Sequence, residues 1–308
     1  MSAGEVTVVS LNLEDGGWDR QHQDHRNLEL LPKLIGQVPS VDVVLFQEGK
    51  HYGLRGQELR YRAETLLGRF GLRSFMTPST IGQLHDLVFV RWPRFRPVTH
   101  YKAGLPDVFH DQIGWLHFQV EGLDRPLAVR SLQWPHWDGG ARLDAAQKLT
   151  GFAAPGRLSL LGGDFNALWP DCRRPRHWWR PWPRRVHREF EPNWERLPPR
   201  KRTHKTLPPG GRPRLWWGPE RLRSDRRAMQ VLKDVGFVNA GCVAGDMTVT
   251  VNANVDHGQG GRIDHILFSP DLAPAQVAGS YRVWISELGT RLTNHRMVSV
   301  RLNLDLAR

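Results

Sequence analysis

The 308-residue sequence is poor in cysteine and in long apolar runs, and both shortages exclude classes of protein. Its two cysteines, Cys172 and Cys242, form no C-x-x-C pair, which argues against a disulfide framework or a zinc cage and favours a reducing compartment. No stretch approaches the roughly eighteen apolar residues of a membrane span. The first residues also lack the regions of a signal peptide. We therefore expect a cytoplasmic protein without a transmembrane segment.

Positive charge is abundant and concentrated in one segment. The formal net charge is +12. Residues 170–227 contain eighteen Arg and Lys against six Asp and Glu, whereas charges in the rest of the chain balance. The same segment holds eleven of the 22 prolines and six of the 13 tryptophans, and it shows no sustained helix or strand period. We interpret it as a basic insertion, because long loops without regular structure tend to be functional or disordered.

Apolar patterns on both sides of this insertion predict a chain of strands and helices. Continuous apolar runs predict buried strands, and apolar residues three and four positions apart predict helices. The predicted strands cover 6–13, 41–46, 87–90, 114–120, 127–134, 158–161, 263–268, 281–285 and 297–304, and the predicted helices cover 27–35, 58–70, 142–152 and 226–235. We expect one domain over 1–308, interrupted at about 170–227.

Polar side chains of catalytic type stand at the ends of these predicted strands. Asn12, Glu48, Asp164 and His295 lie at or just beyond an apolar run, and Asp264 lies inside one. Each alone has a plain structural explanation, such as a turn residue, a solvated carboxylate or a core histidine. Together they offer the oxygen ligands that Mg²⁺ prefers and the proton-transfer groups that phosphoester hydrolysis needs.

Five motifs in this order resemble the endonuclease/exonuclease/phosphatase superfamily. The motifs are Ser10–Glu14 (SLNLE), Leu45–Glu48 (LFQE), Leu161–Asn166 (LGGDFN), Arg262–Ser269 (RIDHILFS) and Thr293–Ser299 (TNHRMVS), and they span nearly the whole chain. The resemblance implies an α/β fold, a four-layer α-β-β-α sandwich with two mixed, largely antiparallel β-sheets. It also implies a divalent-metal-dependent phosphoesterase that uses Mg²⁺ or Mn²⁺.

The resemblance implies a role for each motif residue. Glu48 resembles the principal metal ligand, with Asn12 and Glu14 close by. Asp164 resembles the residue that orients or deprotonates the attacking water, and Asn166 resembles a positioner of phosphate and water. The resemblance makes Asp264 the residue that orients His295, which donates to the phosphate. Either His295 or Asp164 serves as the base, and the sequence leaves that choice open.

Two positions depart from the family's pattern. The usual Ser-Asp-His is Thr293-Asn294-His295 here, so Asn294 can offer a cation a carbonyl oxygen but no negative charge. A family histidine near 127–134 is replaced by Gln133, with His136 three residues later. Either Gln133 or His136 is expected to contact the phosphate. These departures are the only support for a catalytically decayed, nucleic-acid-binding module.

The basic insertion leaves the chain a few residues after Asp164, so it is expected to emerge beside the catalytic face. Arginine next to tryptophan suits phosphate contact combined with base stacking. The candidate contacts here are Arg173, Arg174, Arg176, Trp178, Trp179 and Arg180. The alternative is a solvated arginine-rich loop whose tryptophans pack onto the outside of the domain. We favour nucleic-acid contact, because exposing six tryptophans without a partner is costly.

The sequence therefore predicts a nuclease that hydrolyses DNA by in-line attack of a water activated by metal and Asp164. We prefer DNA to RNA because of the family's nucleases, and no obligate protein partner is evident. A phosphatase or phosphodiesterase acting on a small or lipid phosphoester is the alternative within the same chemistry.

Overall fold

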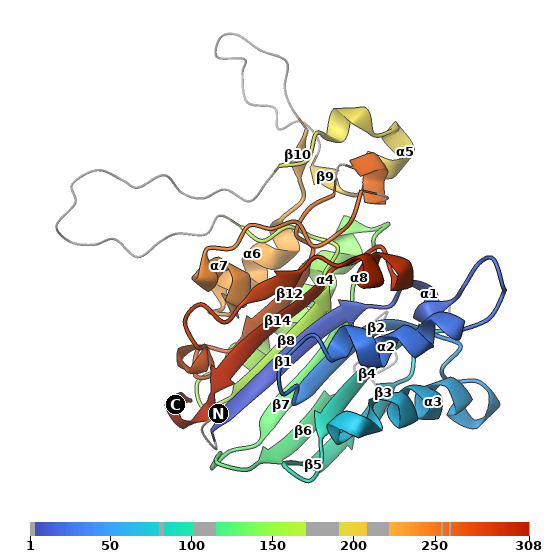
Figure 1. Cartoon of the computed structure of the whole chain (residues 1–308). Coiled ribbons are helices and arrows are strands. Elements are labelled where there is room, and N and C mark those ends of the chain that lie inside the picture. Colours follow the sequence, from blue (N-terminus) through green and yellow to red (C-terminus); the bar gives the residue numbers. More distant parts are fainter. Residues whose placement is uncertain are drawn as a thin grey trace.

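Two β-sheets packed face to face form the centre of the fold in a computed structural model, which describes residues 4–79, 83–101, 115–170, 191–207, 222–253, 255–258 and 260–307. In this part of the chain the six-stranded sheets have the orders β13-β14-β1-β2-β4-β3 and β11-β12-β8-β7-β6-β5. The pairs β1–β2 and β7–β8 are parallel and the other neighbours are antiparallel. Helices cover the outer faces (Figure 1). The predicted four-layer sandwich with mixed, largely antiparallel sheets is confirmed.

The elements have the following bounds. The first sheet contains β1 (Glu5–Asn12), β2 (Val43–Lys50), β3 (Leu72–Thr77), β4 (Leu84–Arg91), β13 (Arg282–Trp284) and β14 (Met297–Asn303). The second contains β5 (Phe95–Tyr101), β6 (Trp115–Val120), β7 (Leu127–Gln133), β8 (Leu158–Asp164), β11 (Val238–Asn239) and β12 (Asp264–Phe268). A separate ribbon pairs β9 (Thr206–Leu207) with β10 (Arg223–Ser224). The α-helices are α1 (Glu14–Gly17), α2 (Leu31–Ile35), α3 (Glu58–Leu67), α4 (Gly139–Leu149), α5 (Pro199–Arg202), α6 (Arg227–Asp234), α7 (Ala240–Ala244) and α8 (Glu287–Leu292).

Three apolar layers hold the sandwich together. Between the sheets, side chains such as Val8 and Leu45 pack against Phe118 and Ile266 of the opposite sheet. On the outer face of the first sheet, α2 and α3 bury their apolar faces against β1, β2 and β4. On the outer face of the second sheet, α4 and α6 pack over β7, β8 and β12. Because the central strands are buried on both faces, they appear in the sequence as unbroken apolar runs.

The alternation of side chains along the strands directs the polar residues into the space between the sheets. Residues two apart share one face of a strand. In β1, Val6 and Val8 belong to the inter-sheet core, so Ser10 and Asn12 follow them on the same face. Below the strand ends, Gln47 donates to Ser10 Oγ at 3.3 Å and to Ser131 Oγ at 2.8 Å. A buried polar layer therefore joins the sheets just beneath the ends of their strands.

The insertion is partly folded, which the sequence period did not predict. Residues 191–207 and 222–227 contain α5, β9 and β10. Trp194 is 7% exposed, and its indole N–H donates to Glu191 and to Ser224 Oγ. Trp194 is thus buried, with hydrogen-bond partners that belong to the insertion itself. Buried Arg142 of α4 also donates to the His204 carbonyl at 2.6 Å, which ties this segment to the second sheet's helical layer.

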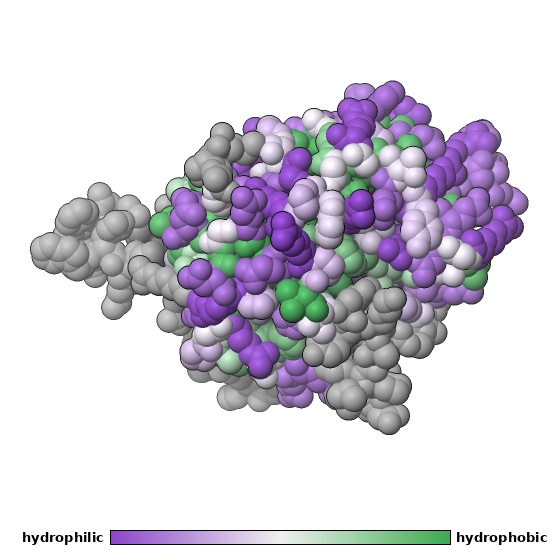
Figure 2. Space-filling model, turned by 90° about the horizontal axis from the view of Figure 1, so that it is seen from below, coloured by the Kyte–Doolittle hydropathy of each residue, from purple (hydrophilic) through white to green (hydrophobic). Residues whose placement is uncertain are grey.

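Two expectations from the sequence, on the state of the cysteines and on membrane-spanning helices, can be compared with the structure. Cys242 is disulfide-bonded, contrary to the expectation drawn from the cysteine count, and Cys172, the chain's other cysteine, lies outside the described residues. Among the helices of the described part, none combines the length and apolarity needed to cross a bilayer. Viewed from the end of the sheets opposite α5, hydrophilic side chains occupy much of the coloured surface (Figure 2).

Candidate active site

The predicted site residues meet at one end of the sandwich, the end at which β1 and β8 finish and α8 lies (Figure 1). In the second sheet, Asp164 pairs in register with Gln133 of β7 and with Asp264 of β12. Each of the three lies four residues from a residue of the inter-sheet core on its own strand, namely Val129, Leu160 and Phe268, and therefore on the same face. Asn12 ends β1 of the facing sheet on the same side. The strand period therefore gathers an acid–amide cluster between the sheet ends.

Glu48 reaches this cluster because its strand is distorted. Regular alternation would direct Glu48 away from the inter-sheet face that Gln47 occupies. The β2–β4 register shifts between Phe46 and Gly49, and Glu48 adopts a left-handed backbone conformation with φ 56°. A bulge of this kind redirects a side chain, and a positive φ at a non-glycine residue is strained. The strain is typical of a functional position.

Amide groups hold the carboxylates together. The Asn12 side-chain NH₂ donates to Glu48 Oε1 at 3.0 Å and to Asp164 Oδ2 at 3.1 Å. Gln133 Nε2 donates to the same two oxygens at 3.1 and 3.2 Å. Gln133 therefore lies in the centre of the site. The Asn12 oxygen accepts the Glu14 backbone N–H at 2.9 Å, so the amide presents its nitrogen, not its oxygen, to Glu48.

Asp164 is fixed by the turn that follows β8. The backbone N–H of Asn166 donates to Asp164 Oδ1 at 2.9 Å, and the Asn166 side chain donates to Asp164 Oδ2 at 3.0 Å and to the Trp134 carbonyl at 2.9 Å. Asn166 also has a positive φ of 47°. Burial is the largest of the causes that together raise the pKa of the Asp164 carboxyl to about 7; the Asp264 and Glu48 charges act in the same direction, whereas His295 and the Asn166 N–H oppose them. A carboxyl with a pKa near neutrality suits proton transfer.

His295 is oriented by Asp264. His295 Nδ1 lies 3.0 Å from both carboxylate oxygens of Asp264, and Asp264 is 1% exposed. Burial alone would lower the pKa of His295, but Asp264 and Asp164 together raise it to about 10. The imidazole is therefore protonated at neutral pH. Its Nε2 lies 3.8 Å from Asp164 Oδ2, too far for a hydrogen bond, so this N–H can donate to a phosphate oxygen.

The loops around the cluster hold the remaining predicted residues. Glu14 accepts the backbone N–H of Asn294 at 2.9 Å, which joins the loop after β1 to the loop after α8. The Asn294 side-chain oxygen is buried without a hydrogen-bond partner. A buried acceptor without a donor is costly unless an ion or water satisfies it. Thr250 Oγ1 accepts the backbone N–H groups of Ile263 and Asp264 at 3.1 Å each, which fixes the start of β12.

The donor set fits a hard cation that keeps part of its hydration shell. Within the described residues, no group of three or more His, Cys, Asp or Glu converges into a protein cage. Mg²⁺ does not need one, since it is commonly held by one or two carboxylates together with waters. Glu48 supplies the central carboxylate, and the unsatisfied oxygen of Asn294 is a neutral oxygen of the type such ions bind.

Glycine packing allows β7 and β8 to approach closely at the site. A Cβ atom at Gly163 would overlap the Leu132 carbonyl oxygen, and one at Gly162 would overlap the Leu45 side chain of the facing sheet. At Gly163 the obstacle is backbone, so only glycine fits there, whereas at Gly162 the Leu45 side chain would have to move. The two glycines before Asp164 therefore bring its strand close to both β7 and the opposite sheet.

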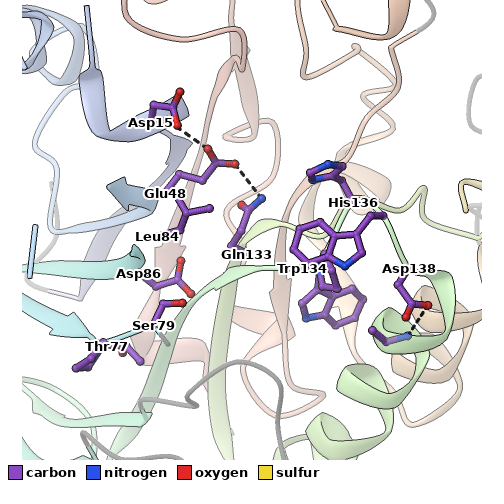
Figure 3. Close-up of a pocket in the computed structure, with 14 residues that line it drawn as sticks. Asp15, Glu48, Thr77, Ser79, Leu84, Asp86, Gln133, Trp134, His136 and Asp138 are labelled. Carbon is purple, nitrogen blue, oxygen red and sulfur yellow. Dashed lines mark hydrogen bonds between the residues drawn. The ribbon is translucent and has the colours of Figure 1, made fainter. Parts of the chain in front are cut away.

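Of the residues predicted to contact substrate, some lie near the cluster, whereas the others lie outside the described part of the chain. His136 lines a pocket of about 370 Å³ that begins at Glu48 and Gln133 (Figure 3). We call it the Trp137 pocket. Its lining residues are Asp15, Glu48, Thr77, Pro78, Ser79, Leu84, Asp86, Gln133, Trp134, Pro135, His136, Trp137, Asp138 and Ala141. The other candidates, Arg173, Arg174, Arg176, Trp178, Trp179 and Arg180, lie outside the described residues.

The sequence analysis missed Asp15, which lies beside the cluster, and Lys50, which pairs with it. The Asp15 backbone N–H donates to Glu48 Oε2 at 3.3 Å, and the Asp15 carboxylate pairs with Lys50 at 2.7 Å. Like Glu48, Asp15 has a positive φ, of 59°. In the sequence, Glu14-Asp15-Gly16-Gly17 directly follows the first apolar run and is typical of a turn, but it does not indicate that a backbone N–H contacts Glu48.

Comparisons with known proteins identify the family of the chain and agree with its fold. A model described as the endonuclease/exonuclease/phosphatase family matches residues 16–286. An AP endonuclease from Archaeoglobus fulgidus is 14% identical, with a TM-score of 0.58 and coverage of 96% of this chain and 98% of that chain. An endonuclease/exonuclease/phosphatase from Bacteroides vulgatus is 13% identical, with a TM-score of 0.60 and coverage of 97% and 98%. The 3′ phosphatase NExo from Neisseria, bound to a product DNA hairpin, is 17% identical, with a TM-score of 0.57 and coverage of 96% and 99%. No curated protein matches the sequence.

Proposed function

The chain belongs to the endonuclease/exonuclease/phosphatase family, and from that premise we propose that it is a divalent-metal-dependent nuclease that hydrolyses DNA. The family and the solved structures indicate a phosphoesterase- or nuclease-type fold. The observation that carries the proposal is the convergence of Asp164, Asn166, the Asp264–His295 pair and Glu48 between the sheet ends.

The site offers a proton acceptor and a proton donor at neighbouring positions. Asp164 is proposed to orient the attacking water and accept its proton, because its pKa of about 7 lets the carboxylate gain a proton near neutral pH. Asn166 holds Asp164 and contributes to placing the phosphate. His295 is proposed to donate from Nε2 to the phosphate as negative charge develops. Its raised pKa favours Asp164 over His295 as the base.

Glu48 is proposed to hold a Mg²⁺ or Mn²⁺ ion, with Asn294, Asn12 and Glu14 around it. When bound, such an ion neutralises charge on the phosphoryl and leaving oxygens. The left-handed conformation of Glu48 and the Asp15 N–H contact fix its carboxylate before substrate arrives. The side-chain oxygen of Asn12 accepts the Glu14 N–H, and its NH₂ group faces Glu48. Asn12 can therefore bind the ion through this oxygen only if its amide group rotates.

A basic surface beside the site supports DNA as the substrate. Arg196, Arg200 and Lys201 are exposed around α5, and Lys205 lines a small cavity together with Asn166. Phosphate contacts of this kind provide affinity that does not depend on sequence. We propose that the insertion at about 170–227, including the arginines and tryptophans of 173–180, contacts the strand that the site cleaves, within one domain over 1–308.

A substrate panel tests this proposal. Purified protein is incubated with supercoiled plasmid DNA, a structured RNA and a chromogenic phosphomonoester, each with Mg²⁺, Mn²⁺ or a chelator. We expect metal-dependent nicking of the plasmid that exceeds turnover of the other two. Phosphate release without nicking would identify a small-molecule phosphatase, and retention of DNA without turnover in any metal would identify a binding module.

The cytoplasmic location stays a prediction from the sequence. It was based in part on the expectation of reduced cysteines, and the disulfide at Cys242 removes that part of its support. Measuring free thiols under native and denaturing conditions, with and without reductant, checks this point directly. The proposal requires no obligate protein partner.

A further inference from the structure

The Trp137 pocket adjoins the catalytic cluster but has a different chemical character. It lies between two walls, one formed by the ends of β3 and β4 and the other by the segment from Gln133 to the start of α4 (Figure 3). The first wall presents Pro78 and Leu84, and the second presents Trp134, His136 and Trp137. Resting on the proposed function, we infer that this pocket binds one unpaired nucleobase of the nucleotide next to the scissile phosphate.

Size and shape favour a ring of this kind. At about 370 Å³, the pocket is at the lower end of the range for small-molecule sites, enough for one nucleoside-sized group. Trp137 is 51% exposed, so much of its surface is accessible to a ligand. His136 meets it edge to face at 4.9 Å, and Asp138 beside it caps α4 through the N–H groups of Gly140 and Ala141. Trp137 therefore directly precedes the capped N-terminus of α4, which fixes the position of its backbone.

The charge of the lining selects against phosphate in the pocket itself. The described lining contains four carboxylates, Asp15, Glu48, Asp86 and Asp138, and neither lysine nor arginine. A phosphate placed there would meet negative charge at short range, whereas an uncharged base would not. Carboxylates and carbonyls also accept hydrogen bonds from the amino and imino groups of bases. The phosphate therefore belongs beside His295 and the cation that Glu48 is proposed to hold, and the base belongs in the pocket.

The pocket's position restricts the substrate. Glu48 and Gln133 belong both to the catalytic cluster and to the pocket lining, so the two sites adjoin. A base in the pocket can therefore belong to the nucleotide whose phosphate lies in the cluster. A base can enter such a pocket only after it leaves the duplex stack, which costs free energy in paired DNA. We therefore expect single-stranded DNA, gaps or frayed ends to be cleaved in preference to intact duplex.

Binding to two matched oligonucleotides tests this inference. One is a single-stranded thymidine oligonucleotide, and the other has the same length and charge but carries a base-free tetrahydrofuran at every position. Affinities are measured by fluorescence anisotropy in chelator, so that neither is cleaved. Trp137→Ala is expected to weaken binding of the thymidine strand by about 5- to 150-fold, the usual effect of removing the stacking partner of one base, and to leave the base-free strand unchanged. Trp137→Phe is expected to retain most of the affinity.

Trp92→Ala is the matched control, because Trp92 is also an exposed tryptophan, at 39%, and it lies against Arg73 away from the site. It is expected to bind both strands as the wild type does. Equal loss of affinity for both strands with Trp137→Ala, or no loss for either, would overturn the inference. Because binding is read without turnover, a protein that cleaves no DNA but shows the base-dependent effect refutes the proposed function alone.

Discussion

Replacing Asp264 by asparagine keeps the side chain's shape but removes the negative charge that orients His295 and stabilises its protonated form. Asp264 is 1% exposed and contacts His295 Nδ1 through both oxygens at 3.0 Å. Because a positioned proton donor contributes roughly 10²- to 10⁴-fold to rate, we expect kcat to fall within that range. KM should change little, since a residue so deeply buried does not reach substrate.

The pH profile provides the more specific readout for Asp264→Asn. Protonated His295 is the active form, so activity is present below its pKa, raised to about 10, and is lost as pH rises through that value. On the acidic side, activity is lost as pH falls through the pKa of Asp164, at about 7 in the metal-free site and lower once a cation binds. In Asp264→Asn the alkaline limb should move at least about one pH unit lower, toward the ordinary histidine value.

The assay is the initial rate of DNA cleavage from pH 5 to pH 11 at saturating Mg²⁺, together with an unfolding curve to show that the variant is folded. Asp19→Asn is the matched control, because Asp19 pairs with His22 at 2.9 Å at an exposed position. It should leave both the rate and the profile unchanged. An Asp264→Asn enzyme with an unaltered alkaline limb would refute the assigned coupling between Asp264 and His295, whatever its kcat.

Three further variants test other parts of the account. Glu48→Gln should raise the Mg²⁺ concentration needed for half-maximal cleavage by about tenfold or more, as a cation titration of the rate will show, because it removes the proposed carboxylate ligand. Gly163→Ala should destabilise the fold by at least about 1–3 kcal/mol in urea unfolding, whereas Gly68→Ala, whose Cβ would meet nothing within 4 Å, should not. The double variant Arg200→Ala/Lys201→Ala should bind DNA more weakly. The slope of the logarithm of its binding constant against the logarithm of salt concentration should fall by about one for each phosphate that it no longer binds. An unchanged slope would show that these two side chains bind no phosphate.

The buried parts of the fold were predictable from the sequence because burial on both faces produces continuous apolar runs. The predicted strands at 6–13 and 263–268 match β1 and β12 to within one residue at each end. The strands at the sheet edges, β3 and β5, were missed. Arg73 is exposed within β3, and β5 contains Pro97 beside a register shift, so neither has a clear apolar period.

The sequence was sufficient to predict which residues gather at the site but not how they are arranged there. Strand parity brings Asn12, Asp164 and Asp264 to the inter-sheet face, and that parity can be read from the sequence. The bulge that turns Glu48 inward depends on the pairing of β2 with β4, and the central position of Gln133 depends on the β7–β8 register. Both are tertiary effects, which local sequence does not encode.

Asp164 is the residue on which the account depends most, so its loss is the most direct test. The measurement is Mg²⁺-dependent nicking of supercoiled plasmid by wild type, Asp164→Asn and Asp144→Asn, the last altering an exposed carboxylate that pairs with Lys148 on α4. We predict that wild type and Asp144→Asn nick the plasmid at equal rates and that Asp164→Asn is slower by at least about 10²-fold. Equal nicking by Asp164→Asn, in folded protein and sensitive to chelator, would contradict the assignment of the active site.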